Sequence, residues 1–159
     1  MLTKFLDLGR QPIANNFLAS DFDANKEHFY HLEMGFDPET LMVTQISPVK
    51  KELMFHENYA YSSSTSKTMQ RHFKEAAEYL FSTFKVGSVL EIGSNDGIFL
   101  RNFLEKNTKI LGVEPCGNFA SLTNKSGIKT FHRFWDLETS REIVEKEGKV
   151  DLVFSANCM

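Results

Sequence analysis

The sequence predicts an α/β fold with a parallel sheet over residues 61–159, preceded by a small β-rich module over residues 1–60. Residues 86–98, VGSVLEIGSNDGI, contain a short apolar run, then a glycine-containing turn, then apolar residues that continue at helical spacing. A second apolar run at 110–113, ILGV, leads into Glu114. Short apolar runs of this kind are typical of parallel strands that are buried on both faces.

The β-rich module is indicated by short apolar stretches separated by turn residues. Residues 5–9 and 11–15 predict a short strand and a turn. Residues 29–36 and 41–47 predict two further strands, joined by the turn sequence DPET at 37–40.

In the α/β domain, helices and strands are expected to alternate. Ser66 or Thr68 is suited to cap a helix that carries an apolar face from Met69 to Phe84. The following elements are strand 87–92, helix 97–106, strand 109–114, helix 117–125, strand 128–131, helix 137–147 and strand 150–155. Right-handed crossovers place the second and third strands on one side of the first, and the fourth on the other. The fourth strand is then an apolar edge, which predicts self-association.

The turn after the first strand of the domain has the features of a nucleotide-binding loop. Gly93 and Gly97 allow a ligand to approach the backbone and the start of the next helix closely. Glu114 follows Gly93 by 114 − 93 = 21 residues, about where such folds place an acidic side chain that accepts the ribose hydroxyls.

The charges in the loop indicate which nucleotide it binds. Glu91 and Asp96 would repel a pyrophosphate, whereas they favour the ammonium and sulfonium of S-adenosylmethionine (SAM). An NAD-dependent sugar enzyme is therefore the weaker alternative, because it needs a phosphate-binding turn. In an ordinary α/β domain, the same two residues are a strand-end carboxylate and a helix N-cap.

Composition excludes several classes of protein. The 159 residues are 42% apolar with a net charge of −3, which suits a globular domain with a small appendage. There is no apolar run near 18 residues and no leader-like segment, so we expect a cytoplasmic protein without a membrane partner. The sequence has no stripe of basic residues that would indicate binding to nucleic acid. Cys116 and Cys158 do not form a pair at metal-binding spacing and are expected to be free thiols.

Several segments resemble the deoxysugar C-methyltransferase family. They are LDLG at 6–9 with PIAN at 12–15, YAYSS at 59–63, His72, LEIGSNDG at 90–97, and GVEP at 112–115 with Asn118. The resemblance implies a Rossmann-like class I methyltransferase fold, C-terminally incomplete in this chain because such a sheet has further strands after the fourth. It also implies SAM as the cofactor and a nucleotide-linked keto-deoxysugar as the substrate, methylated at carbon.

This sequence departs from the family pattern at the positions of the zinc ligands. The family's N-terminal module carries two C-x-x-C pairs, but Asp37 and Thr40 stand at the second pair and the chain begins after the first. We therefore expect a module that has lost its ligands and binds no zinc.

The resemblance assigns the SAM cradle to six residues: Glu91, Gly93, Asn95, Asp96, Gly97 and Glu114. Its chemistry requires a base that removes a proton next to the keto group of the sugar. Tyr59, Tyr61 and His72 are the local catalytic candidates, although His72 also suits packing at its helical spacing. Tyr61 and Asn157 are candidate substrate neighbours, and Asp136 is a candidate for the adenine amino group.

Two function classes follow. The first is a SAM-dependent C-methyltransferase, represented here by an incomplete chain that is inactive alone. The second is a non-catalytic SAM- or nucleotide-binding module for assembly, favoured by the missing cysteines and the missing downstream catalytic groups.

Overall fold

The computed structural model describes residues 1–158, and the chain divides into two compact units. The first unit is Met1–Phe55, and the second begins at His56. Within the described residues, no helix combines the length and apolar character needed to cross a membrane.

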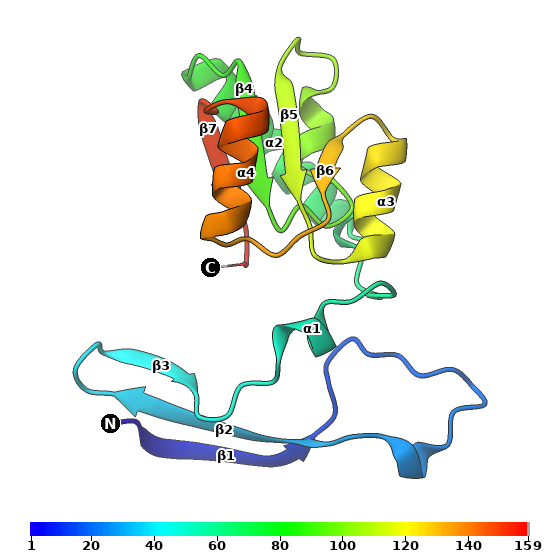
Figure 1. Ribbon diagram of the computed structural model, residues 1–159, viewed down its shortest axis with the longest axis vertical. Helices are drawn as coiled ribbons and strands as arrows, with labels where there is room; N and C mark the ends of the chain where they lie inside the picture. Colours follow the sequence, from blue (N-terminus) through cyan, green and yellow to red (C-terminus); the bar gives the residue numbers. More distant parts are fainter. Residues whose placement is uncertain (159) are drawn as a thin grey trace. The chain divides into compact units, whose positions relative to one another are not determined.

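The first unit is a three-stranded antiparallel sheet in the order β1-β2-β3 (Figure 1). Its elements are β1 Thr3–Gln11, η1 Ala24–Lys26, β2 Tyr30–Asp37, β3 Met42–Gln45 and α1 Lys51–Met54. The β-rich character predicted from the sequence is thus present, with a longer first strand than expected.

The sheet of the first unit has almost no buried core. Of residues 1–55, Ala24 aside, only Gly35 is buried. Large apolar side chains on this unit, such as Phe17 and Leu41, are exposed. The fold of the unit therefore depends on the strand ladder and on polar side-chain contacts, because little apolar surface is removed from water.

The second unit contains a four-stranded parallel sheet in the order β6-β5-β4-β7 (Figure 1). Its elements are η2 Ser63–Thr65, α2 Lys67–Thr83, β4 Ser88–Ile92, η3 Leu100–Phe103, β5 Lys109–Val113, α3 Gly117–Lys125, β6 Lys129–Phe131, α4 Leu137–Glu147 and β7 Leu152–Ser155. The predicted parallel sheet and its strand order are confirmed, and β7 is an edge strand.

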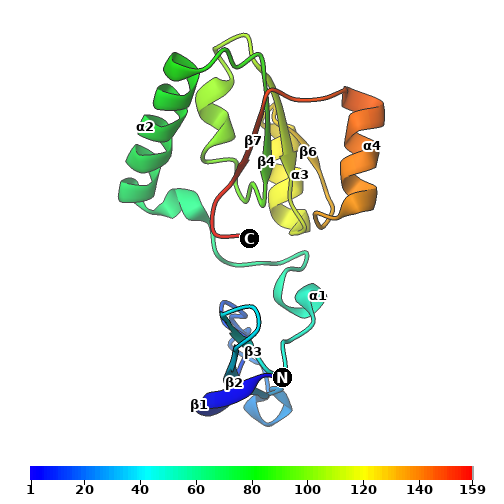
Figure 2. The ribbon, with the colours of Figure 1, turned by 90° about the vertical axis from the view of Figure 1, so that its left-hand side faces the viewer.

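Helices α2 and α4 cover opposite faces of this sheet (Figure 2). Neighbouring side chains of a strand point to opposite faces of the sheet. The side chains of β4 therefore contribute to an apolar core on each face. Val89 packs in the cluster that contains Phe73 of α2, whereas Leu90 packs with Ile143 of α4. The sheet is therefore packed on both faces.

The prediction of a helix over residues 97–106 is wrong, because only the short 3-10 helix η3 forms in this segment. The side-chain amide of Asn102 donates to the carbonyls of Ile98 and Phe99 at 2.9 Å each. It thereby competes for backbone acceptors that an α-helix would use. Asn107, with φ at +49°, then turns the chain into β5.

Helix α2 begins where its cap was expected. The Ser66 side chain accepts from the backbone N–H of Met69 at 3.3 Å, so Ser66 and not Thr68 is the N-cap.

Candidate functional site

The candidate site lies where β4 and β5 end. Gly93 follows β4 with φ at +69°, and Gly97 has φ at +75°. A Cβ atom on Gly97 would lie 2.8 Å from the Ile128 side chain, and one on Gly93 would lie 2.2 Å from the Cys158 sulfur. The left-handed backbone therefore favours glycine at these two positions, and a Cβ atom at either would have to displace a neighbouring side chain.

Glu114 joins the two loops. One of its carboxylate oxygens accepts from the backbone N–H of Asn95 at 2.6 Å, and the other from that of Cys116 at 2.8 Å. The residue is only 3% exposed. An ionised carboxylate has about four acceptor positions, so Glu114 keeps capacity for further donors beyond these two backbone groups.

Two more carboxyl groups are buried beside it. Glu91 and Asp96 are each 3% exposed. Burial raises the pKa of Glu91 well above its usual range, and the nearby Glu114 and Asp96 raise it further. One oxygen of each of these two carboxyl groups lacks a hydrogen-bond partner, as does the Ser94 hydroxyl. Arg101 approaches Asp96 at 3.8 Å, and the site otherwise has an excess of acidic groups.

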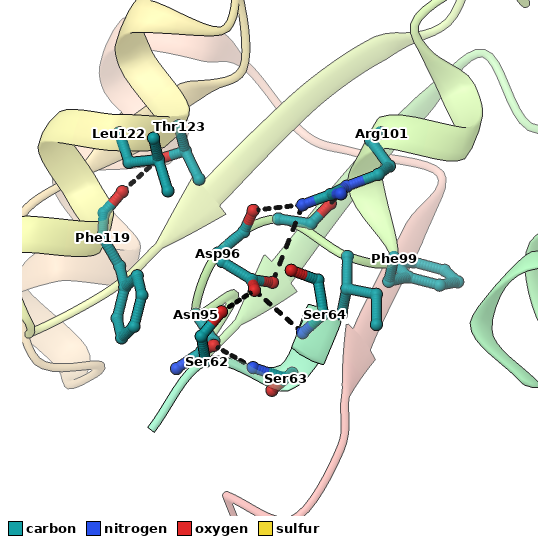
Figure 3. Close-up of polar contacts among 12 residues, drawn as sticks. Ser62, Ser63, Ser64, Asn95, Asp96, Phe99, Arg101, Phe119, Leu122 and Thr123 are labelled. Atoms are coloured by element: carbon teal, nitrogen blue, oxygen red, sulfur yellow. Dashed lines mark hydrogen bonds and ion pairs between the residues drawn. The ribbon is translucent and has the colours of Figure 1, made fainter. Parts of the chain in front are cut away.

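A segment that we call the strap, residues 56–64, crosses this site and contacts the loop after β4. The Ser62 hydroxyl and the Ser64 backbone N–H both donate to one oxygen of Asp96 (Figure 3). The Asn95 side chain accepts from the Ser63 N–H at 2.9 Å and donates to the Tyr61 carbonyl at 3.0 Å.

The other end of the strap contacts the start of α3. Asn118 donates its backbone N–H to the Glu57 carbonyl at 3.2 Å and its side-chain amide to the Tyr59 carbonyl at 2.8 Å. The Tyr59 ring meets the edge of Phe119, with ring centroids 6.4 Å apart. The sequence predicted Tyr61 as a substrate neighbour and did not predict these contacts. The run of three serines close to a predicted helix cap was the signal that was available.

The structure brings together the six predicted cradle positions and the strap, which carries Tyr59 and Tyr61. His72 is exposed on α2, and none of the contacts described for residues 1–158 joins it to the loop or the strap. Asn157 is exposed after β7 with φ at +58°. Asp136 caps α4 by accepting from the Thr139 N–H at 2.7 Å.

The two cysteines are free thiols in different surroundings. Cys116 is buried, and Cys158 is exposed close to Gly93. Burial raises the pKa of both thiols, and the Glu114 carboxylate adds to the increase. Neither thiol belongs to a cluster of metal ligands among the described residues.

In the first unit, a polar contact joins Asp37 and Thr40, the two positions where the resemblance implied cysteines. The Thr40 hydroxyl donates to Asp37 at 2.9 Å, which closes the turn between β2 and β3. Elsewhere, ligand atoms of Asp7, His31 and Glu33 lie within 4.8 Å of one another. The Lys4 ammonium contacts both carboxylates of that group, at 2.6 Å to Glu33 and 3.3 Å to Asp7, and so offsets part of their negative charge.

Two comparisons relate this chain to known proteins. Residues 1–55 match the model of a family described as "Putative zinc binding domain". The chain is 24% identical over 156 residues to the C-methyltransferase NovU of Streptomyces niveus, which covers 96% of this chain and 37% of that protein. Together, the two matches support a family relationship between this chain and the C-methyltransferases. The chain spans little more than a third of the length of this curated relative.

Proposed function

We propose that the chain is the donor-binding part of a SAM-dependent C-methyltransferase, with a Rossmann-like class I fold. The observation that carries the proposal is the set of three buried carboxyl groups, Glu91, Asp96 and Glu114, around a glycine turn. The relationship to a C-methyltransferase supports it.

The residues present fit SAM in their chemistry. Glu114 has acceptor positions left for the two ribose hydroxyls. The carboxyl groups of Glu91 and Asp96 suit a cationic ligand and oppose a phosphate, and Arg101, 3.8 Å from Asp96, offsets only part of their charge. The same groups disfavour NAD, whose pyrophosphate would meet this acidic cluster. When bound, SAM supplies an electrophilic methyl group.

The chain's own residues would bind and orient the donor. Gly93 and Gly97 let it approach the backbone, and Glu114 fixes the ribose. A cation near Glu91 would lower the pKa of that carboxyl group, because an opposite charge favours its ionised form. Donor binding should therefore release a proton from Glu91 in the pH range between its bound and free pKa values.

We propose that the methyl acceptor is a nucleotide-linked keto-deoxysugar, which enters the site from the side of Tyr61. We also propose that the protein acts in the cytoplasm. Tyr61 is half exposed on the strap, and Asn157 is exposed at the end of β7. Among the contacts described for residues 1–158, none positions the His72 ring or the Tyr61 hydroxyl as a base beside the cradle. We therefore infer that residues 1–159 bind the donor without turning over the sugar.

A second candidate is a non-catalytic SAM-binding module. It is favoured because none of the contacts described for residues 1–158 joins His72 to the loops, and because Asp37 and Thr40 bond to each other where the resemblance implied thiols.

Calorimetric titration with S-adenosylhomocysteine (SAH) and NAD tests the donor site that both candidates share. SAH binding without NAD binding is expected. Incubation with radiolabelled SAM and a nucleotide-linked keto-deoxysugar separates the candidates when the assay is repeated on a chain extended to the length of NovU. Methyl transfer by the extended chain supports the enzyme, and its absence despite SAH binding supports the module.

A further inference from the structure

The strap touches both loops that form the proposed donor site. Its first half is held by Asn118 after β5, and its second half by Asn95 and Asp96 after β4. We propose that Asn95 is a positioning residue that couples the strap to Glu114, so that donor binding orders the strap. The proposal rests on the proposed function, since the donor is what engages Glu114.

Asn95 has contacts in both directions. Its backbone N–H donates to Glu114 at 2.6 Å. Its side chain accepts from Ser63 and donates to Tyr61, as Figure 3 shows in part. A hydrogen bond in which one partner is ionised is about twice as strong as a neutral one, so the contact with Glu114 fixes the backbone of Asn95 firmly.

The backbone of Asn95 is in the left-handed region, with φ at +46°. Asparagine tolerates this conformation better than most residues with a side chain. In this conformation the N–H faces Glu114 while the side chain faces the strap. A shift of Glu114 on ligand binding would therefore be transmitted directly to Tyr61 and Ser63.

Asp96 supplies a parallel tether. Its side chain is 1% exposed, and it receives the Ser62 hydroxyl and the Ser64 N–H. The strap thus closes over a buried carboxylate of the cradle. Because coupling between two binding events is reciprocal, a strap held in place should strengthen donor binding as much as the donor holds the strap.

The test compares two variants of the same kind in the full chain of residues 1–159. Asn95→Gly removes both side-chain contacts with the strap, while glycine accepts the left-handed backbone without strain. Asn107→Gly is the matched control, because Asn107 has φ at +49°, is exposed and lies outside the site. Asn95→Asp keeps an acceptor for the Ser63 N–H but loses the donor to Tyr61.

Two readouts are needed. In the absence of ligand, amide hydrogen exchange of Ser63 and Ser64 should be at least about tenfold faster in Asn95→Gly than in wild type. Exchange should be unchanged in Asn107→Gly and intermediate in Asn95→Asp. In calorimetry with SAH, Asn95→Gly should bind about fivefold or more weakly, the low end of measured coupling between sites. SAH should also slow exchange of the strap amides in wild type.

Unchanged exchange at Ser63 and Ser64 in Asn95→Gly would overturn the role of Asn95 in holding the strap. Faster exchange with wild-type SAH affinity would overturn the coupling. If wild type bound no SAH, the proposed function would be wrong and the coupling with it, while the exchange data would still decide whether Asn95 holds the strap.

Discussion

Glu91 should make the second unit less stable as pH rises, and Glu91→Gln should remove this dependence. Glu91 is buried, one of its oxygens is unpaired, and Glu114 and Asp96 are nearby. Burial first, and these charges second, raise its pKa in the folded chain. In the unfolded chain its pKa is about 4.3. The folded state therefore holds a proton that the unfolded state releases.

The sign follows from this difference. Below about pH 4.3, Glu91 is protonated in both the folded and the unfolded chain. The neutral carboxyl group of the wild type and the carboxamide of Glu91→Gln then contribute similarly to the free energy of unfolding. Above that pH the wild type loses up to about 1.4 kcal/mol of unfolding free energy per pH unit relative to the variant, until the folded pKa is reached. The difference between the two curves is then constant.

Urea unfolding at half-unit steps from pH 4 to 8 measures this difference. Trp135 is the single tryptophan and packs in the core that contains Leu90 and Ile143, so its fluorescence reports on the second unit. Glu105→Gln, at an exposed position, controls for the loss of one negative charge. Parallel curves for wild type and Glu91→Gln, or a wild type that gains stability with pH relative to the variant, would refute the reasoning.

Three further predictions concern other parts of the chain. Elemental analysis after dialysis should find no stoichiometric zinc, because the side chains of Asp37 and Thr40 bond to each other and thiolates are missing there; one zinc per chain retained against a chelator would contradict this. Val153→Lys, at an exposed position of edge strand β7, should reduce self-association in light scattering, and an unchanged mass distribution would argue against association through this edge. Residues 1–159 should not methylate a nucleotide-linked keto-deoxysugar, so turnover at an enzyme-like rate would place the base within this chain.

The sheet of the second unit could be predicted because its signals are local and strong. The apolar run at β4, the turn between Gly93 and Gly97, and right-handed crossovers together determine the strand order. The region after Gly97 could not be predicted in the same way. Its apolar spacing is helical, but the Asn102 side chain competes for the carbonyls, and this competition depends on rotamers that the pattern does not contain.

The proximity of the two loops that carry the proposed cradle was predictable, and their contacts with the strap were not. The spacing between Gly93 and Glu114 placed two loops together, as the structure has them. The strap contacts of Asn95 and Asp96 could not be foreseen, because they join positions more than 30 residues apart in the sequence, such as Ser63 and Asn95. Such contacts are determined by tertiary packing, which short-range patterns do not report.

The central claim is that Glu114 binds the ribose of a SAM-type ligand. Glu114→Ala removes the acceptor and should weaken SAH binding by about 1.5–3 kcal/mol, the range for hydrogen bonds that involve a charged group. It also leaves the N–H groups of Asn95 and Cys116 without their acceptor, so Trp135 fluorescence must first show that the variant is folded at the temperature used. Glu114→Gln, which keeps the shape and one acceptor oxygen, should lose less.

Isothermal titration calorimetry of wild type and Glu114→Ala with SAH is the most direct measurement. The account predicts SAH binding by wild type, no NAD binding, and a dissociation constant at least about tenfold higher in the folded variant. Binding of NAD in place of SAH, or a folded Glu114→Ala chain that binds SAH as tightly as wild type, would contradict it.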